Sequence, residues 1–394
     1  MITKIFNVEC FAPDALGRRE ILIADGRIAA LAASVDAWGS IVQVLDGRGC
    51  LAVPGFVDTL AHITGGGGEG GFRTRTPELD IDDAIRSGVT TLVGVLGTDA
   101  VTRSLPNLLA KAHAIEEEGL SCYCYTGSYQ IPARTLLRDV MEDIALIDKF
   151  IGVGEVAIAD HRSSQPTVDE LKKLAAQARV GGMLAGKAGI VSVHVGAALS
   201  GLALLHQVVS DSDIPITQFY PTHINRNLAL LQQGLQFVAQ GGYVDFTTST
   251  TLQELAGGEV KCSLALKRAV DAGADISRIS FSSDANASLP LFDAENRFSG
   301  LGVGKIASLF GEVRDAVLDE NIPLATALSV VTRNPAKILK LTGKGELAVG
   351  RDADIVLLDP DSLQIRAVLA GGRCLYSDST LAIASVASRL FAAT

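Results

Sequence analysis

The stretch Ile-Val-Ser-Val-His-Val-Gly, residues 190–196, carries the pattern that decides the fold. Its three valines alternate with Ser192 and His194, so a β-strand here places the valines on one face and the two polar side chains on the other. A strand of a closed barrel packs one face against helices and turns the other into the barrel. The alternation therefore predicts a barrel strand with an inward histidine.

Similar short apolar segments recur along the chain and alternate with helical stretches. The eight predicted strands are residues 55–63, 90–97, 122–129, 153–159, 190–196, 216–223, 243–248 and 279–284. Helical stretches such as 105–118, 168–180 and 260–272 lie between them. Eight strand–helix units over this length predict an α/β fold, the (β/α)8 barrel of the TIM type.

Segments rich in β-forming residues flank this region at both ends of the chain. Asp25-Gly26 lies between two apolar runs, which predicts a hairpin over residues 21–31. Matching segments return at residues 353–358, 365–369 and 373–376. We predict that the two ends pair into one small β-sandwich domain, residues 1–54 and 344–394, and that residues 55–343 form the barrel.

Composition excludes several classes of partner. The chain has 394 residues, 48% hydrophobic and 20% charged, which is typical of a globular protein. Its formal net charge of -10 argues against nucleic acid and anionic membrane surfaces. The N-terminus has no secretory segment and no apolar run reaches membrane-spanning length, so we expect a cytoplasmic protein. The six cysteines form no C-x-x-C pair, and we expect reduced, mostly buried thiols.

The parity argument extends to two other predicted strands. At residues 279–284, Ile279 and Phe281 share one face and leave Asp284 on the inward face. At residues 153–159, the side chains predicted to face inward are those of Val153, Glu155 and Ala157.

Glu155, His194, His223 and Asp284 lie late in four different predicted strands, where barrel active sites are built. Each alone could be a hydrogen-bonded structural residue, but their convergence favours a metal site. Two histidines and a carboxylate suit zinc and leave a position for water, whose pKa the metal lowers to about 7. Asp284 would accept the proton of that water and pass it to a leaving amine.

Two glycine-rich stretches have different interpretations. Residues 65–71 follow the first predicted strand and lack the Gly-Lys-Ser/Thr of a phosphate loop, so nucleotide binding is not expected. Glycines there would let the backbone approach a ligand at the active site, and a flexible surface loop is the alternative. Gly300, Gly302 and Gly304 are spaced like part of a dinucleotide fingerprint but lie outside any βαβ unit, and we predict a loop.

Polar side chains after three predicted strands suit substrate recognition. Arg162 and Arg226 follow strands four and six and fit bidentate binding of carboxylates; surface ion pairs explain them equally well. Tyr129 ends strand three and could polarise a carbonyl; a core tyrosine is equally consistent.

Together these segments resemble the amidohydrolase superfamily and, within it, the bacterial isoaspartyl (β-aspartyl) dipeptidases, nearly from end to end. The stretch Gly-Arg-Asp-Ala-Asp at 350–354 is typical of the superfamily, whereas residues 65–69 and 222–227 are narrower signals. The other stretches that carry the resemblance are residues 54–58, 97–99, 126–129, 160–163, 179–182 and 282–284.

The resemblance implies two zinc ions. The first is held by a His-x-His pair, the strand-eight aspartate and a carbamylated lysine; the lysine bridges to the second, which the histidines of strands five and six also bind. Here Leu60 replaces the first histidine, two residues before His62, and Glu155 replaces the lysine, with Gly154 as a competing alignment.

Both replacements remove ligands of the first metal. A single metal held by Glu155, His194 and His223 remains, with His62 and Asp284 as further candidate ligands. Such a Glu-His-His site with an acid–base aspartate resembles some N-acetylglucosamine-6-phosphate deacetylases of the same superfamily.

The substrate side matches the dipeptidases more closely. The resemblance implies that Glu69 and Ser288 hold the free amino group of the substrate, Arg162 and Arg226 its carboxylates, Thr98 the aspartyl moiety and Tyr129 the scissile carbonyl.

We therefore predict a zinc-dependent hydrolase of β-aspartyl dipeptides that works with one zinc ion and, like the family, forms homo-oligomers. An N-acyl amino acid deacylase is one alternative, and Glu69 argues against it because Glu69 would bind a free ammonium group. A catalytically silent ligand-binding homologue is the other, and metal analysis discriminates it.

Overall fold

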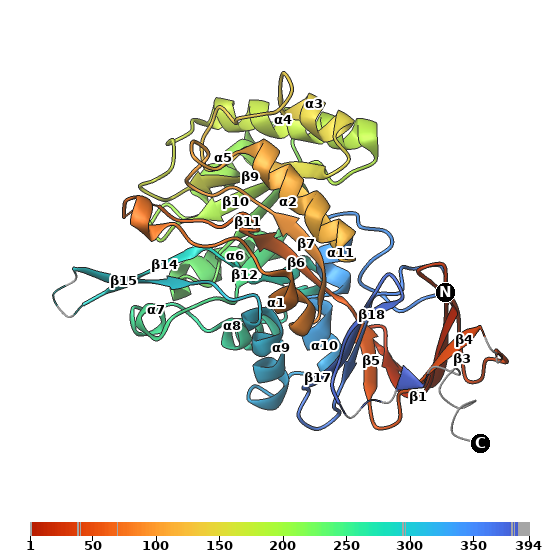
Figure 1. The fold of residues 1–394 in the computed structure, drawn as a ribbon. Helices are drawn as coiled ribbons and strands as arrows, with labels where there is room; N and C mark the ends of the chain where they lie inside the picture. The colour runs from red at the N-terminus through yellow and green to blue at the C-terminus, as the bar shows by residue number, and fades with distance from the viewer. Residues whose placement is uncertain are drawn as a thin grey trace.

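The computed structural model describes residues 2–379 apart from 38, 40, 69, 294 and 296, together with residues 381, 383 and 384. A barrel surrounded by helices packs beside a β layer that contains the N-terminus (Figure 1). The predicted α/β barrel with a small additional β region is confirmed. Among the described residues, no helix combines the length and apolar character needed to cross a membrane.

Eight parallel strands form the barrel. Six pair in chain order, and two pair with each other: β6 (Phe56–Ala61), β7 (Val89–Gly94), β8 (Ser121–Thr126), β9 (Phe150–Ile158), β10 (Ile190–Val195) and β11 (Phe219–Thr222), then β12 (Val244–Thr247) and β13 (Ile279–Ser282). Backbone hydrogen bonds link the two groups. Ile224 N–H donates to the Asp245 carbonyl on one side, and on the other Asp284 N–H donates to the Leu60 carbonyl and His62 N–H to the Ala285 carbonyl. All eight predicted strands are present. The sixth begins at Phe219 because residues 216–218 form a 3-10 turn.

Helices follow the strands and cover the barrel (Figure 1). The three predicted helical stretches are confirmed as α2, α4 and α8. Thr167 and Glu170 close a reciprocal capping box at the start of α4, which satisfies two free backbone N–H groups. The helices are α1 (Ile81–Arg86), α2 (Leu105–Glu117), α3 (Val140–Leu146), α4 (Val168–Ala185), α5 (Ala203–Ser210), α6 (Leu228–Ala239), α7 (Leu252–Ala256), α8 (Cys262–Asp271), α9 (Ser308–Leu318), α10 (Leu324–Ser329) and α11 (Arg333–Ile338).

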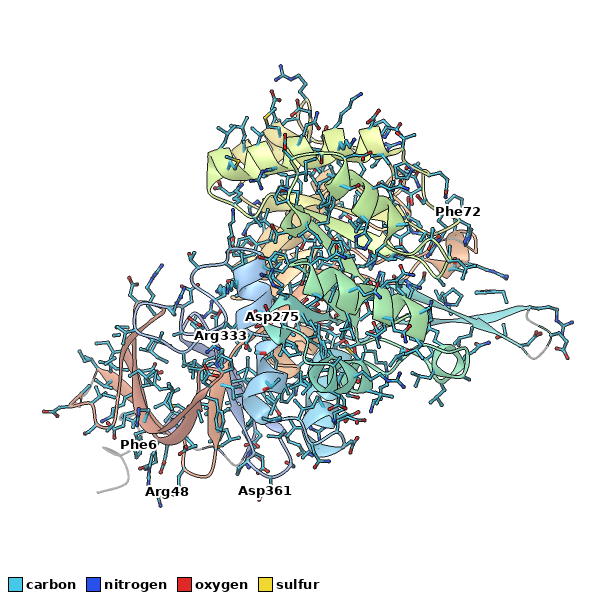
Figure 2. The ribbon with its side chains drawn as sticks, turned by 180° about the vertical axis from the view of Figure 1, so that it is seen from behind. Phe6, Arg48, Phe72, Asp275, Arg333 and Asp361 are labelled. Carbon is cyan, nitrogen blue, oxygen red and sulfur yellow. The ribbon has the colours of Figure 1, made fainter. Side chains whose placement is uncertain are left out.

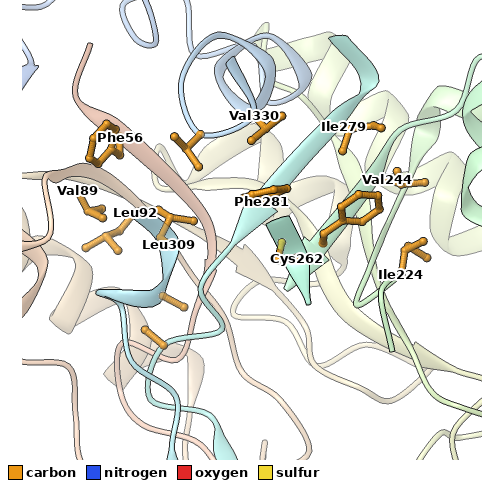
Figure 3. Packing of buried hydrophobic residues seen from close by; sticks show 14 of the residues in the cluster. Phe56, Val89, Leu92, Ile224, Val244, Cys262, Ile279, Phe281, Leu309 and Val330 are labelled. Carbon is orange, nitrogen blue, oxygen red and sulfur yellow. The ribbon is translucent and has the colours of Figure 1, made fainter. Parts of the chain in front are cut away.

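The main core lies between the barrel strands and these helices. Figure 3 shows Phe281 and Ile279 of β13 packed near Val330, and Val244 of β12 near Ile224. Ile279 and Phe281 thus occupy the helix-facing side, as strand parity predicts. Cys122 and Cys124 are buried in this same core, as core packing predicts.

The two chain ends share one β-sheet with its own core. Its strand order is β18-β17-β16-β5-β1-β2-β3, and β4 branches from β1, so the expected sandwich is one continuous branched sheet. The ends meet where β5 pairs antiparallel with β16. The strands are β1 (Ile2–Phe11), β2 (Ala15–Ala24), β3 (Arg27–Ala32), β4 (Val42–Asp46), β5 (Leu51–Pro54), β16 (Ile355–Leu358), β17 (Ile365–Ala370), β18 (Arg373–Ser377) and β19 (Ile383–Ala384).

Arg333 of α11 connects this sheet to the barrel. Figure 2 shows it between the barrel and the sheet that carries Phe6. Its guanidinium lies 2.6 Å from Asp14 Oδ2 and 3.0 Å from Glu346 Oε1. The exact division at residues 54/55 and 343/344 stays a prediction.

The prediction of a loop at Gly300, Gly302 and Gly304 is wrong for the first two glycines and confirmed for Gly304. Gly300 and Gly302 lie in β15 (Phe298–Val303), which pairs antiparallel with β14 (Ser288–Phe292). This hairpin projects from the barrel (Figure 1). The glycines have neighbours across the hairpin, such as Leu289 beside Gly302, and sequence alternation did not reveal the pairing because small residues interrupt it.

Candidate metal centre

Strand β9 carries Glu155 on a bulge. Val153 is opposite Val191 and Val156 is opposite Val193, so β9 contains one extra residue over this stretch. Gly154 has φ 151, and a Cβ there would lie 2.6 Å from the Ser192 carbonyl oxygen, so the bulge requires glycine.

The bulge corrects the predicted parity of β9. Val153 packs in the outer core with Val156 and Ile158, whereas simple alternation predicted that it faces inward with Glu155. The extra residue reverses the faces on its two sides. The structure brings Glu155, and not Gly154, to the histidines.

Glu155, His194 and His223 form one buried cluster. Glu155 Oε2 lies 3.5 Å from His194 Nδ1 and 3.5 Å from His223 Nε2, and one ligand atom from each residue falls within 4.8 Å of the others. All three side chains are at most 2% exposed. Among the described residues this is the group of His, Cys, Asp and Glu side chains with metal-site spacing.

The cluster fits a divalent cation. Tetrahedral ligands at 2.0–2.1 Å from zinc lie about 3.3 Å apart, close to the distances between Glu155 and the two histidines. Glu155 Oε2 is buried and accepts no hydrogen bond from the described residues. A buried carboxylate oxygen between two imidazole nitrogens gains most from a cation, because an uncompensated buried charge is costly.

Electrostatics hold the ligands in their metal-binding forms. Burial opposes ionisation of Glu155, but the facing imidazoles of His194 and His223 outweigh it, and the Glu155 pKa is lowered. Burial, with the nearby Arg226 and His194, lowers the pKa of His223 to about 4. At neutral pH the cluster therefore offers a carboxylate and a neutral His223, the forms that bind metal.

His62 and Asp284 lie beside the cluster. His62 Nε2 is 3.2 Å from Asp284 Oδ1 and 3.5 Å from Glu155 Oε1. Burial opposes ionisation of Asp284, but His62 and His223 outweigh it and lower the Asp284 pKa, so this carboxylate is ionised at neutral pH. His62 thus bridges two carboxylates.

Leu60 takes the place of the missing ligand in an apolar cluster. Its side chain is 2% exposed and belongs to the interior cluster with Val93, Val95 and Tyr125. The position is filled by packing, and the Leu60 side chain offers no ligand atom to a metal.

Tyr129 and Asp160 contact opposite nitrogens of His194. Tyr129 Oη is 2.7 Å from Nδ1, and Asp160 Oδ2 is 3.0 Å from Nε2. Burial, followed by the charge of Glu155, raises the Tyr129 pKa well above its usual value, so its hydroxyl stays protonated. Asp160 belongs to the 160–163 motif, but strand periodicity does not mark its role because the residue lies after the strand ends.

A cavity of about 510 Å³ lies beside the cluster, and His194 of the cluster lines it. The residues predicted to bind substrate line it together with His62, His194 and Asp284: Thr98, Tyr129, Arg162, Arg226 and Ser288. Glu69 lies outside the described residues, but its neighbours Gly66, Gly67 and Gly70 line the cavity, as predicted for a loop beside the site. The hairpin β14–β15 adds an apolar wall of Leu289, Pro290, Phe298 and Leu301.

The two arginines differ in their bonding. Arg162 forms a two-pronged ion pair with Asp160, at 3.0 Å from Nε to Oδ1 and 2.7 Å from Nη2 to Oδ2. Arg226 has no carboxylate within 4.0 Å among the described residues, and its buried Nε has no hydrogen-bond partner there. Of the two, Arg226 is the guanidinium with bonding capacity to spare.

Arg103 is a second residue that sequence reasoning missed. It is 7% exposed, lines the cavity and donates to the backbone carbonyls of Gly66 and Thr76, at 3.1 and 2.9 Å. It thereby holds the glycine-rich loop in place.

Known proteins match the chain over most of its length. The sequence pattern of the Amidohydrolase family matches residues 51–384. The chain belongs to the amidohydrolase family. Its members act as hydrolases, and this protein is a hydrolase; the predicted superfamily membership is confirmed.

Two solved structures and one further relative show which members of the family the chain is similar to. The β-aspartyl dipeptidase of Fervidobacterium islandicum AW-1, in complex with β-Asp-Leu dipeptide, is 43% identical, with a TM-score of 0.89 over 97% of this chain and 99% of that chain. N-acetylglucosamine-6-phosphate deacetylase from Pasteurella multocida shares the fold at 14% identity, with a TM-score of 0.61 over 96% of this chain and all of that one. An allantoinase from Bacillus licheniformis is 24% identical, covering 87% of this chain and 84% of its own.

Proposed function

We propose that this amidohydrolase cleaves the isopeptide bond of β-aspartyl dipeptides with a single zinc ion held by Glu155, His194 and His223. The observation that carries the proposal is the buried three-residue cluster beside an arginine-lined cavity, which His194 of the cluster lines. The 43% identity to a β-aspartyl dipeptidase that binds β-Asp-Leu supports the substrate class.

The number of zinc ions follows from the ligands on each side. Glu155, His194 and His223 supply three protein ligands and leave a fourth position for water. On the other side Leu60 supplies none, and His62 and Asp284 contact each other at 3.2 Å. Among the described residues, His62 and Asp284 form no second group of metal-site spacing with Glu155.

The bound zinc would supply Lewis acidity and lower the pKa of a water molecule to about 7. Asp284, ionised beside His62, accepts the proton of the attacking water and delivers it to the leaving amine. The protonated hydroxyl of Tyr129 donates to the scissile carbonyl oxygen as negative charge develops there. The products are aspartate and the second amino acid.

Substrate recognition divides between the cavity walls. Arg226 binds a substrate carboxylate with its unused donors, and Arg162, anchored by Asp160, lines the same cavity. Thr98 contacts the aspartyl moiety, and Ser288 and Glu69 bind the ammonium group. The apolar wall formed by Leu289, Phe298 and Leu301 favours a second residue such as leucine.

Two measurements test the proposal together: elemental analysis of the purified protein and turnover of β-Asp-Leu. We expect about one zinc per chain and cleavage that is lost on chelation and restored by zinc. Glu155→Gln should lose both zinc and activity, because the amide removes the negative charge of the cluster. Two zinc ions per chain at full occupancy would contradict the single-metal site.

The same assays separate the alternatives. Preference for N-acetyl amino acids over β-aspartyl dipeptides would establish the deacylase instead. Zinc bound without turnover of either substrate would establish a silent ligand-binding homologue.

We further propose that the protein forms a homo-oligomer in the cytoplasm. Size-exclusion chromatography with light scattering tests the assembly, and cell fractionation tests the location.

A further inference from the structure

The carboxylate of Asp160 joins the metal cluster to the arginine wall of the cavity. Asp160 follows β9, and its side chain is 7% exposed. Oδ2 lies 3.0 Å from His194 Nε2 and 2.7 Å from Arg162 Nη2. Oδ1 accepts from the backbone N–H of Arg162 at 2.8 Å and from its Nε at 3.0 Å. One rigid, buried group therefore contacts a metal ligand and a substrate-binding side chain.

The contact with His194 selects its tautomer. A neutral imidazole carries a proton on one nitrogen and a lone pair on the other. A carboxylate at 3.0 Å from Nε2 can only accept, so the proton lies on Nε2 and the lone pair on Nδ1. Nδ1 is the nitrogen that faces Glu155 Oε2, at 3.5 Å. In the metal-free protein Tyr129 can donate to that lone pair at 2.7 Å.

Arg162 would select the opposite tautomer if Asp160 were absent. Its Nη2 lies 3.4 Å from His194 Nε2, and a guanidinium can only donate. Without the carboxylate between them, this donor favours a lone pair on Nε2 and moves the proton to Nδ1, the metal-facing nitrogen. Asp160 prevents this by binding both partners.

We infer that Asp160 is a positioning residue that fixes His194 in the tautomer that binds metal and holds the Arg162 guanidinium at the cavity wall. The inference rests on the proposed function, because it assumes that His194 is a ligand. It predicts that metal affinity depends on a residue that touches neither metal nor substrate.

Asp160→Asn is the decisive variant. The amide preserves size but has one acceptor oxygen. Because Oδ1 accepts from both the backbone N–H and Nε of Arg162, we expect the amide oxygen to take the place of Oδ1 and the NH2 group to face His194 Nε2 and donate to it. The proton of His194 moves to Nδ1 and blocks the metal-facing lone pair. Loss of a partner of this kind weakens metal binding by about 10–100-fold.

Asp99→Asn provides the matched control. Asp99 also lines the cavity, pairs with an arginine at 2.9 Å (Arg75 Nη1) and accepts a backbone N–H two residues on, from Val101. Its carboxylate accepts from Arg75, Val101 and Thr102, and none of these partners is a histidine. The same change of charge there should leave zinc affinity unaltered.

Zinc affinity is measured on metal-stripped protein by competition with a chelator of known affinity. We expect a zinc Kd 10–100-fold higher for Asp160→Asn than for wild type and Asp99→Asn. With zinc saturating, the KM for β-Asp-Leu should also rise in Asp160→Asn, since Arg162 loses one prong of its anchor. An unchanged zinc Kd in a folded Asp160→Asn protein would overturn the inference.

Imidazole ¹⁵N spectra of the metal-free wild type test the tautomer without any change at Asp160. We expect His194, assigned with a His194→Gln variant, as the Nε2–H form; the Nδ1–H form would overturn the inference even if Asp160→Asn does not fold. Failure of the proposed function is separate. If the wild type cleaves no β-aspartyl dipeptide, the proposed activity is wrong. If Asp160→Asn nevertheless binds zinc more weakly, the positioning role of Asp160 is still supported.

Discussion

Each half of the site is built on neighbouring strands, β9 to β11 in one half and β13 with β6 in the other, but the two halves differ in the ligand atoms that they provide. Glu155, His194 and His223 direct three ligand atoms to one point, within 4.8 Å of each other. On the other half Leu60 packs into an apolar cluster, and His62 is left between the carboxylates of Asp284 and Glu155. The comparison teaches that packing in the barrel tolerates a hydrophobic side chain at a ligand position. Binding of a second metal does not tolerate it, because each ligand residue has to supply a lone pair.

The backbone of the altered half is intact. Asp284 N–H still donates to the Leu60 carbonyl at 3.1 Å, and Ser283 N–H donates to Asp58 at 3.0 Å. These bonds keep Asp284 beside His62 without help from a metal. Asp284 is therefore free to act in proton transfer, which the following changes test.

The largest expected effect is that of Asp284→Asn. The amide cannot accept the proton of the attacking water, so activity should fall by about 10²–10⁴-fold. Zinc content should stay near wild type, because the ligands belong to the other half. Kinetics and elemental analysis on the same sample check both. Loss of zinc together with activity would make Asp284 a ligand and erase the distinction between the halves.

Leu60→His tests whether a single substitution restores a second zinc site in the half that contains Leu60. A polar ring replaces a side chain that is 2% exposed, so the free energy of unfolding should fall by about 2–4 kcal/mol. Zinc should remain at about one per chain, because the bridging lysine is still absent. Urea unfolding and metal analysis measure this, with Leu60→Met as the size-matched control, expected to cost under about 1.5 kcal/mol. A second zinc ion in Leu60→His would show that Leu60 alone decides metal number.

Arg226→Met tests whether Arg226 binds a substrate carboxylate. It removes charge-assisted hydrogen bonds to a substrate carboxylate and should weaken binding of β-Asp-Leu by about 1.5–3 kcal/mol, mostly as a higher KM. Steady-state kinetics provide the measurement, and zinc content the control. Unchanged kinetics would remove Arg226 from the binding site.

Asp245 probes the polar layer between β11, β12 and β13 that adjoins both halves. It accepts hydrogen bonds from Thr222 at 2.7 Å and Ser280 at 2.6 Å, yet burial raises its pKa to about 7. The folded protein thus keeps a proton that the unfolded chain releases near pH 4, and Asp245 costs stability as pH rises between about 4 and 7. Asp245→Asn should gain stability relative to wild type over that window, by up to about 1.4 kcal/mol per pH unit. Urea unfolding across the range measures it, and a pH-independent difference would contradict the raised pKa.

Sequence reasoning succeeded where one strand contained the whole signal. The alternation in residues 190–196 assigned His194 to the inward face, and Ile279 and Phe281 to the outer core. It failed where two strands interact. The bulge at Gly154 reversed Val153, and the pairing of Gly302 with Leu289 turned an expected loop into a hairpin.

The amino-acid sequence by itself determined the barrel, because side-chain alternation and segment length follow from local backbone geometry. It also determined which ligand types are present and which, at Leu60, is missing. Only the tertiary structure decided which lone pairs converge and that Asp160 joins His194 to Arg162. The reason is physical: hydrogen bonds and metal ligands act over about 3 Å, and such distances between strands far apart in the chain are fixed only when the barrel closes.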